Sequence, residues 1–172
     1  MNLQSRQAAD VSDTIGLLIS ILVRYSEVAS INFDPQGQAL KFTFIFSGYL
    51  SKEDQETFEV KLWDYLDAYL LLEDKNTEVA SMQWIPYDKF SILELTRDVD
   101  TLSQEEIAII ITLVKEDFGH GLVSENSDSI AEEDLMIQEE LIGHMLENLK
   151  GSRQEKKLIA FREEGKVLVF NK

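Results

Sequence analysis

Residues 39–47 read Ala-Leu-Lys-Phe-Thr-Phe-Ile-Phe-Ser, with a large apolar residue at every second position. This alternation is typical of a β-strand that buries one face. The apolar face consists of Leu40, Phe42, Phe44 and Phe46. Upstream, the apolar run 28–33 ends in Asp34-Pro35-Gln36-Gly37, residue types that are favoured at successive positions of a β-turn. Residues 28–47 are therefore predicted to form a β-hairpin.

A long helix and a second hairpin follow. Ser51-Lys52-Glu53-Asp54 resembles a capping box, and the helix that it opens is expected to end near Leu72. The next two apolar segments, 79–85 and 90–97, are predicted strands joined through Pro86-Tyr87-Asp88. The chain thus presents hairpin, helix and hairpin in succession.

A third helix completes a repeated order of elements. Ser103-Gln104-Glu105-Glu106 is a full capping box, and its helix is expected to end near Phe118, with Gly119 in the left-handed position beyond it. The two capping boxes are offset by 52 residues, and Pro35 and Pro86 by 51. We interpret this as two β-β-α units that form one antiparallel sheet with both helices on one face, an α+β fold. The alternative is that a common motif recurs by chance.

Two further elements flank these units. Residues 12–27 predict a helix that is apolar on most sides, and such a helix is expected to be buried or to lie in an interface. Near the C-terminus, the apolar runs 158–161 and 166–170 flank Glu163-Glu164-Gly165 and predict a hairpin. Because both faces of this hairpin are apolar, it is expected to join the edge of the main sheet or to pair with its copy in another subunit.

The predicted domain organisation follows from these elements. Residues 1–118 form an α+β core domain, 119–129 a polar linker, and 130–172 an acidic helix with the C-terminal hairpin. We expect the last segment to pack on the core as part of one structural unit, because its apolar residues need cover.

The charge of the chain limits its partners. The net charge is −16 over 172 residues, so a broad nucleic-acid-binding surface is not expected. From Lys150 onward, seven basic residues stand against three acidic ones, which leaves nine basic and 29 acidic residues in the preceding part. This cationic tail is expected to fold onto its own acidic body, or to reach an acidic partner or second subunit.

No apolar run is long enough for a membrane span, and there are no cysteines. Together with a polar N-terminus that lacks a signal pattern, this favours a soluble cytoplasmic protein without membrane contact. Motifs for nucleophilic catalysis and nucleotide binding are absent from the sequence, and no cofactor is expected.

The histidines offer the main alternative to a non-catalytic function. Glu140, His144 and Glu147 share one face of the acidic helix and could hold a divalent cation. Their spacing differs from the Glu-x-x-His motif of di-iron helices, so we favour a solvated face with no bound metal. His120, between two glycines at a helix end, is a minor catalytic candidate.

The segment Trp84-Ile85-Pro86-Tyr87 is the predicted contact site. A turn tip has little core in which to hide apolar side chains, so Trp84, Pro86 and Tyr87 are expected to bind a partner or ligand. The sequence as a whole predicts a non-catalytic binding or regulatory module that works through protein–protein contact, as a homodimer. The alternative is a small metal- or ligand-dependent enzyme that uses helix carboxylates and a histidine.

Overall fold

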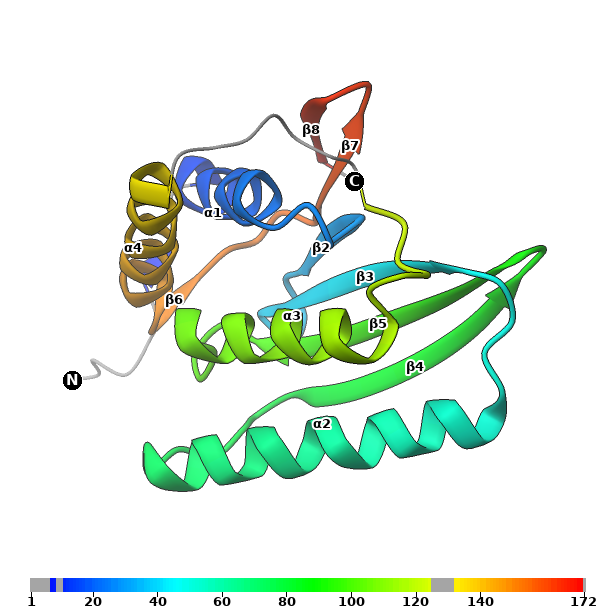
Figure 1. Ribbon diagram of the computed structural model, residues 1–172. Coiled ribbons are helices and arrows are strands. Elements are labelled where there is room, and N and C mark those ends of the chain that lie inside the picture. The colour runs from blue at the N-terminus through cyan, green and yellow to red at the C-terminus, as the bar shows by residue number, and fades with distance from the viewer. Residues whose placement is uncertain (1–6, 9–10, 125–131, 172) are drawn as a thin grey trace.

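The computed structural model describes residues 7–8, 11–124 and 132–171 (Figure 1). Its helices are α1 (Val11–Arg24), α2 (Lys52–Leu72), α3 (Gln104–Phe118) and α4 (Glu132–Leu149). Its strands are β1 (Gln7–Ala8), β2 (Ser30–Asp34), β3 (Ala39–Ser47), β4 (Ala80–Tyr87), β5 (Phe90–Asp98), β6 (Ser152–Arg153), β7 (Leu158–Glu163) and β8 (Lys166–Asn171). Residues 125–129 of the predicted linker 119–129 lie outside the described residues.

The main sheet has six strands in the order β4-β5-β3-β2-β7-β8, and every neighbouring pair is antiparallel. β1 and β6 form a separate, short parallel pair. The predicted α+β class with an antiparallel sheet is confirmed. The two edges of the main sheet are β4 and β8.

The two β-β-α units lie side by side through β3 and β5. Phe42 pairs with Leu95 and Phe44 with Leu93. With an offset of 51 residues, Phe42 is equivalent to Leu93 and Phe44 to Leu95, so each residue pairs with the equivalent of the other one. The expected turn at Pro86 is wrong, however, because Pro86 lies within β4 and the chain reverses at 88–89. The strand register therefore supports the two-unit arrangement better than the proline spacing does.

The helices cover one face of the sheet. Alternate strand residues such as Phe44 and Leu93 are fully buried, and α1, α2 and α3 pack on them (Figure 1). α4 packs mainly on α1, from the side away from the sheet. This position explains the all-round apolar character of α1, which is covered by the sheet on one side and by α4 on another.

The predicted helix starts are confirmed with one change of detail. Ser51 Oγ accepts a hydrogen bond from the Asp54 N–H at 3.1 Å, and Ser103 Oγ from the Glu106 N–H at 3.2 Å. The Glu106 carboxylate, in contrast to a full capping box, turns away to bind another residue. The left-handed conformation expected at Gly119 is wrong, since its φ of −54° continues the helix.

The C-terminal hairpin docks on its own chain. β7 pairs with β2 from Ser30↔Phe161 to Phe33↔Leu158, and β8 completes the edge. Of the two arrangements expected for this hairpin, joining the edge of the main sheet is therefore the one observed. Its outer strand, β8, has no neighbouring strand on its free side among the described residues.

Candidate interaction surface

No described helix covers the second face of the sheet. The buried core and the side chains packed against it include the strand residues of one face only, and none of the alternate residues on the other face. Within the described ranges, the helices that contact the sheet do so from the buried side. We call the second face the open face.

The open face is apolar at the β7–β8 end, polar in the middle and apolar again near the β4–β5 turn, where Ile45, Ile85, Ile92, Tyr87 and Phe90 lie. Ile159 lies opposite Phe170, and Phe161 opposite Leu168, so four apolar side chains share this end. The Phe161 and Phe170 rings stack with their centroids 5.6 Å apart, and 51 % of Phe170 remains exposed. In the middle, Lys41 and Glu94 form an ion pair at 3.2 Å. The β7–β8 end is therefore one of two parts of this face that suit apolar contact, and the two differ in the sheet edge that each adjoins.

The β4 edge carries a structural safeguard against pairing with a further strand. The two-residue loop 88–89 makes Tyr87 and Phe90 the hydrogen-bonded pair that closes the hairpin. In every second residue of β4, ending with Pro86, the backbone N and C=O groups therefore point away from β5. Proline has no N–H, and its presence at an outward position removes a donor that an added strand would need.

Among the described residues, the β8 edge has no such safeguard. The loop 164–165 makes Glu163 and Lys166 the closing pair of the hairpin, so Val167, Val169 and Asn171 direct their backbone groups to the free side. Residues 167–170 contain neither proline nor a charged side chain. An unprotected, apolar edge of this kind is a template for a further strand.

Arg162 holds this hairpin against the end of α1. Its guanidinium donates hydrogen bonds to the backbone oxygens of Leu22 at 2.5 Å, Tyr25 at 2.7 Å and Val28 at 2.6 Å. Carbonyl groups at a helix C-terminus lack partners within the helix and favour a positive charge. The contact fixes the position of β7 relative to α1.

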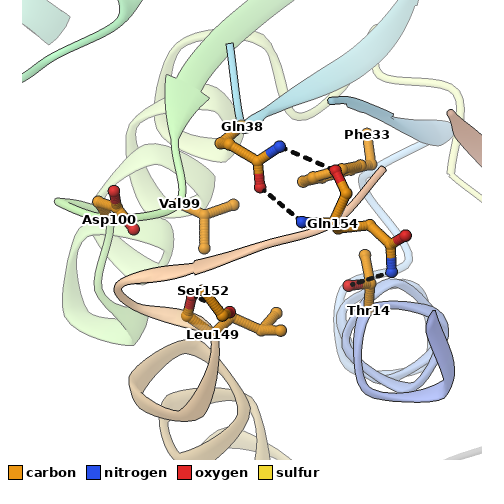
Figure 2. A pocket seen from close by; sticks show the side chains of 8 residues that line it. All are labelled: Thr14, Phe33, Gln38, Val99, Asp100, Leu149, Ser152 and Gln154. Atoms are coloured by element: carbon orange, nitrogen blue, oxygen red, sulfur yellow. Dashed lines mark hydrogen bonds between the residues drawn. The ribbon is translucent and has the colours of Figure 1, made fainter. Parts of the chain in front are cut away.

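A second contact joins the segment that precedes β7 to the β2–β3 turn. The Gln38 side chain donates to the Gln154 carbonyl at 2.8 Å and accepts from the Gln154 N–H at 3.0 Å (Figure 2). The cavity beside this pair measures about 10 Å³. Such a volume suits a single water molecule, so this cavity is not a ligand site.

The most strongly charged interior site is a cluster around Arg97. Its guanidinium binds both carboxylate oxygens of Glu106, at 2.6 and 2.8 Å, and also contacts Asp98 and Thr101. Burial raises the pKa of Glu106, and the hydrogen bond and charge of Arg97 counteract it only in part. Burial acts in the same direction on Asp98, but hydrogen bonds from Val79 and Thr101 and the charge of Arg97 bring its pKa below the usual value.

This cluster is a structural site. Arg97, Asp98 and Glu106 are at most 1 % exposed, so no substrate reaches them. Asp98 also accepts hydrogen bonds from the backbone N–H groups of Glu78 and Val79, which precede β4. The cluster thus joins the start of β4, the end of β5 and the first turn of α3.

The predicted contact residues do not form one site. Trp84 points to the buried face, where its ring contacts those of Phe46, Phe58 and Phe118. Tyr87 is an odd number of residues away and lies on the opposite face, with 67 % of its surface exposed. Pro86 lies between them at the exposed β4 edge. The period of two along the strand separates the two aromatic side chains.

The histidine trio of α4 does not converge either. Glu140 and His144 line an open depression of about 400 Å³ near the start of α3, whereas Glu147 pairs with Lys150 at 2.6 Å. The hydrogen bond from Lys150 lowers the pKa of Glu147. In the part of the chain that the structure describes, no group of three or more His, Asp or Glu side chains is placed to hold a metal ion.

His120 lines a different open depression, of about 450 Å³, between the start of α2 and the end of α3. Asp54 and Asp117 share it, but Asp117 already pairs with Lys61 at 2.8 Å. Nothing in this arrangement activates a nucleophile or orients the imidazole.

Comparison with known protein families, with curated proteins and with solved structures finds no match to this chain. Among the described helices, none combines the length and hydropathy that crossing a bilayer requires.

Proposed function

We propose that this protein is a non-catalytic binding or regulatory module that works through contact with another polypeptide chain. The binding surface consists of the β8 edge and the adjoining apolar end of the open face. The observation that supports this proposal is the contrast between the two sheet edges: β4 carries Pro86 at an outward position, whereas 167–170 is free of proline and charge.

The chemistry of this surface suits an extended segment. Backbone groups of Val167, Val169 and Asn171 offer hydrogen bonds to a strand, while Leu168 and Phe170 offer apolar contact on the open face. The alternative, an enzyme with carboxylates and a histidine, gains no specific observation in its favour. The cytoplasmic location expected from the sequence remains a prediction.

Site-specific photo-crosslinking tests the proposal. A benzophenone amino acid replaces Phe170 at the proposed surface or, as a matched control, Tyr87 at the far end of the open face; both native side chains are aromatic and more than half exposed. We expect a discrete adduct with a polypeptide from position 170 and none from position 87. The absence of any such difference, in purified protein and in the source cells, contradicts the proposal.

A further inference from the structure

We infer that the strand that pairs with β8 is β8 of a second copy, antiparallel to the first about a two-fold axis perpendicular to the sheet. This inference rests on the proposed function and names its partner. The result is a continuous sheet of twice the six strands of one chain, with the helices of both copies on the same face.

Charge complementarity between hairpin ends supports this partner. Glu163, Glu164 and Lys166 lie at the turn of the hairpin and give it a net charge of −1, whereas Lys156 and Lys157 lie at its open end. All five are exposed, and none forms an ion pair with another described residue. β7 is six residues long, so roughly 20 Å separates the two ends within one hairpin and precludes direct contact there.

The antiparallel arrangement brings these opposite charges together. When β8 pairs with its copy, the turn of each hairpin lies beside the open end of the other. The turn of one copy, with a net charge of −1, then lies near the basic open end of its partner, twice by symmetry. A parallel arrangement would place like charges at each end and is disfavoured.

The free flank of α1 supports the same geometry. Arg24 pairs with Glu139 of α4 at 2.6 Å, and Leu18 is fully buried over the sheet. Ile19 and Val23, one turn apart on the remaining flank, are 36 % and 37 % exposed. α1 packs on β7 and β8 and also on α4 (Figure 1), and among the described residues these elements leave the flank with Ile19 and Val23 uncovered.

The spacing between the two copies of α1 is suitable for contact. Neighbouring strands lie about 4.8 Å apart. A helix above the β7–β8 pair and its two-fold copy would therefore have axes roughly 10–14 Å apart, at or just beyond the usual helix-packing distance of about 8–10 Å. Ile19 and Val23 of each copy would face each other above the β8–β8 junction.

Charge reversal tests this geometry in the full chain. The all-acidic variant carries Lys156→Glu and Lys157→Glu, and the all-basic variant carries Glu163→Lys and Glu164→Lys. We expect sedimentation at low ionic strength to show a dimer for the unchanged protein and self-association about tenfold weaker for each variant. An equimolar mixture of the two variants should restore a one-to-one dimer, because every turn then faces an opposite charge.

Matched controls change the net charge equally at distant sites. Lys52→Glu with Lys89→Glu, and Glu53→Lys with Glu56→Lys, alter exposed residues of α2 and the β4–β5 turn. These controls should dimerise as the unchanged protein does. A mixture of the hairpin variants that fails to recover the dimer overturns the inference, and so does an unchanged chain that remains monomeric at about 100 µM.

The outcomes also separate this inference from the proposed function. A monomeric chain with a discrete adduct from position 170 to a different polypeptide overturns the two-copy arrangement and leaves the binding module. A monomer without an adduct overturns both. A dimer that is insensitive to every hairpin charge overturns the arrangement of the two copies alone.

Discussion

Arg97 and Glu106 form a two-pronged ion pair in the interior of the protein. Nε and Nη2 of the guanidinium meet the two carboxylate oxygens at 2.6 and 2.8 Å, and both side chains are completely buried. Only nine positions separate the two residues, yet Arg97 lies near the end of β5 and Glu106 in the first turn of α3. The pair therefore ties the first turn of α3 to the end of β5.

Replacement of Arg97 by Met should strongly destabilise the fold. The variant leaves Glu106 and Asp98 buried without their cation, and uncompensated buried charge of this kind costs about 3–5 kcal/mol. Chemical denaturation at pH 7 measures the change. Lys41→Met is the matched control, because Lys41 forms a half-exposed ion pair with Glu94, for which a loss of about 1 kcal/mol or less is expected. Equal losses in the two variants would contradict the assigned role of Arg97.

Asp98→Asn should alter the pH dependence of stability. Since the folded-state pKa of Asp98 is lowered from 3.8, its carboxylate contributes stability above that value and loses this contribution as the pH falls through the folded pKa. We expect the variant to be about 2 kcal/mol less stable at pH 7, with the difference narrowing below about pH 4. Urea titrations at pH 7, 4 and 3 measure it. A difference that is constant over this range would show that Asp98 does not titrate as described.

Arg162→Met should loosen the C-terminal hairpin. Three backbone carbonyls near the end of α1 lose a charged donor, for which we expect a loss of about 2–3 kcal/mol in unfolding free energy. Hydrogen exchange should also show faster exchange of β7 and β8 amides before β3 is affected. Arg153→Met, which removes only an exposed pair with Glu155, is the control. Uniform exchange across the sheet would argue against a local anchor.

Glu164→Asn should stabilise the hairpin turn. Glu164 has φ of 51° and Gly165 φ of 78°, a combination for which Asn-Gly is the preferred sequence. The expected gain is about 0.5 kcal/mol, measured by thermal melting of dilute protein at high salt, where self-association and surface charge contribute little. Glu163→Asn removes the same charge from a strand position and should bring no gain. A similar gain in both variants would identify relief of charge repulsion as the cause.

The sequence predicts the scaffold well because its signals are local. Alternation in 39–47, the turn at Pro35 and the two capping serines all act over a few residues, and each leads to the expected element. The hairpin turn at Pro86 is wrong for a physical reason. Proline is compatible with an edge strand when its missing N–H faces outward, and whether a strand lies at an edge is decided by the whole sheet.

The candidate surface depends on long-range arrangement and is harder to predict. The largely apolar segment 166–170 indicates a need for cover on both faces. It does not show that β7 pairs with β2, so that β8 has no second neighbouring strand among the described residues. Trp84, Pro86 and Tyr87 are expected to act together because they are close in sequence. Along a strand, however, successive side chains point to opposite faces, so Trp84 joins the core while Tyr87 does not.

Pro86 also bears on the size of any assembly. A sheet that could accept a new strand at both ends would add copies without limit and grow into a fibre, the route by which edge pairing becomes amyloid. If only the β8 edge of each chain accepts a strand, formation of the dimer uses both β8 edges. The outer edges of the dimer's sheet are then the two β4 strands, each of which carries Pro86. Replacing Pro86 by valine would restore the missing donor at the outer edge and convert a reaction that terminates at two chains into one with the potential to polymerise.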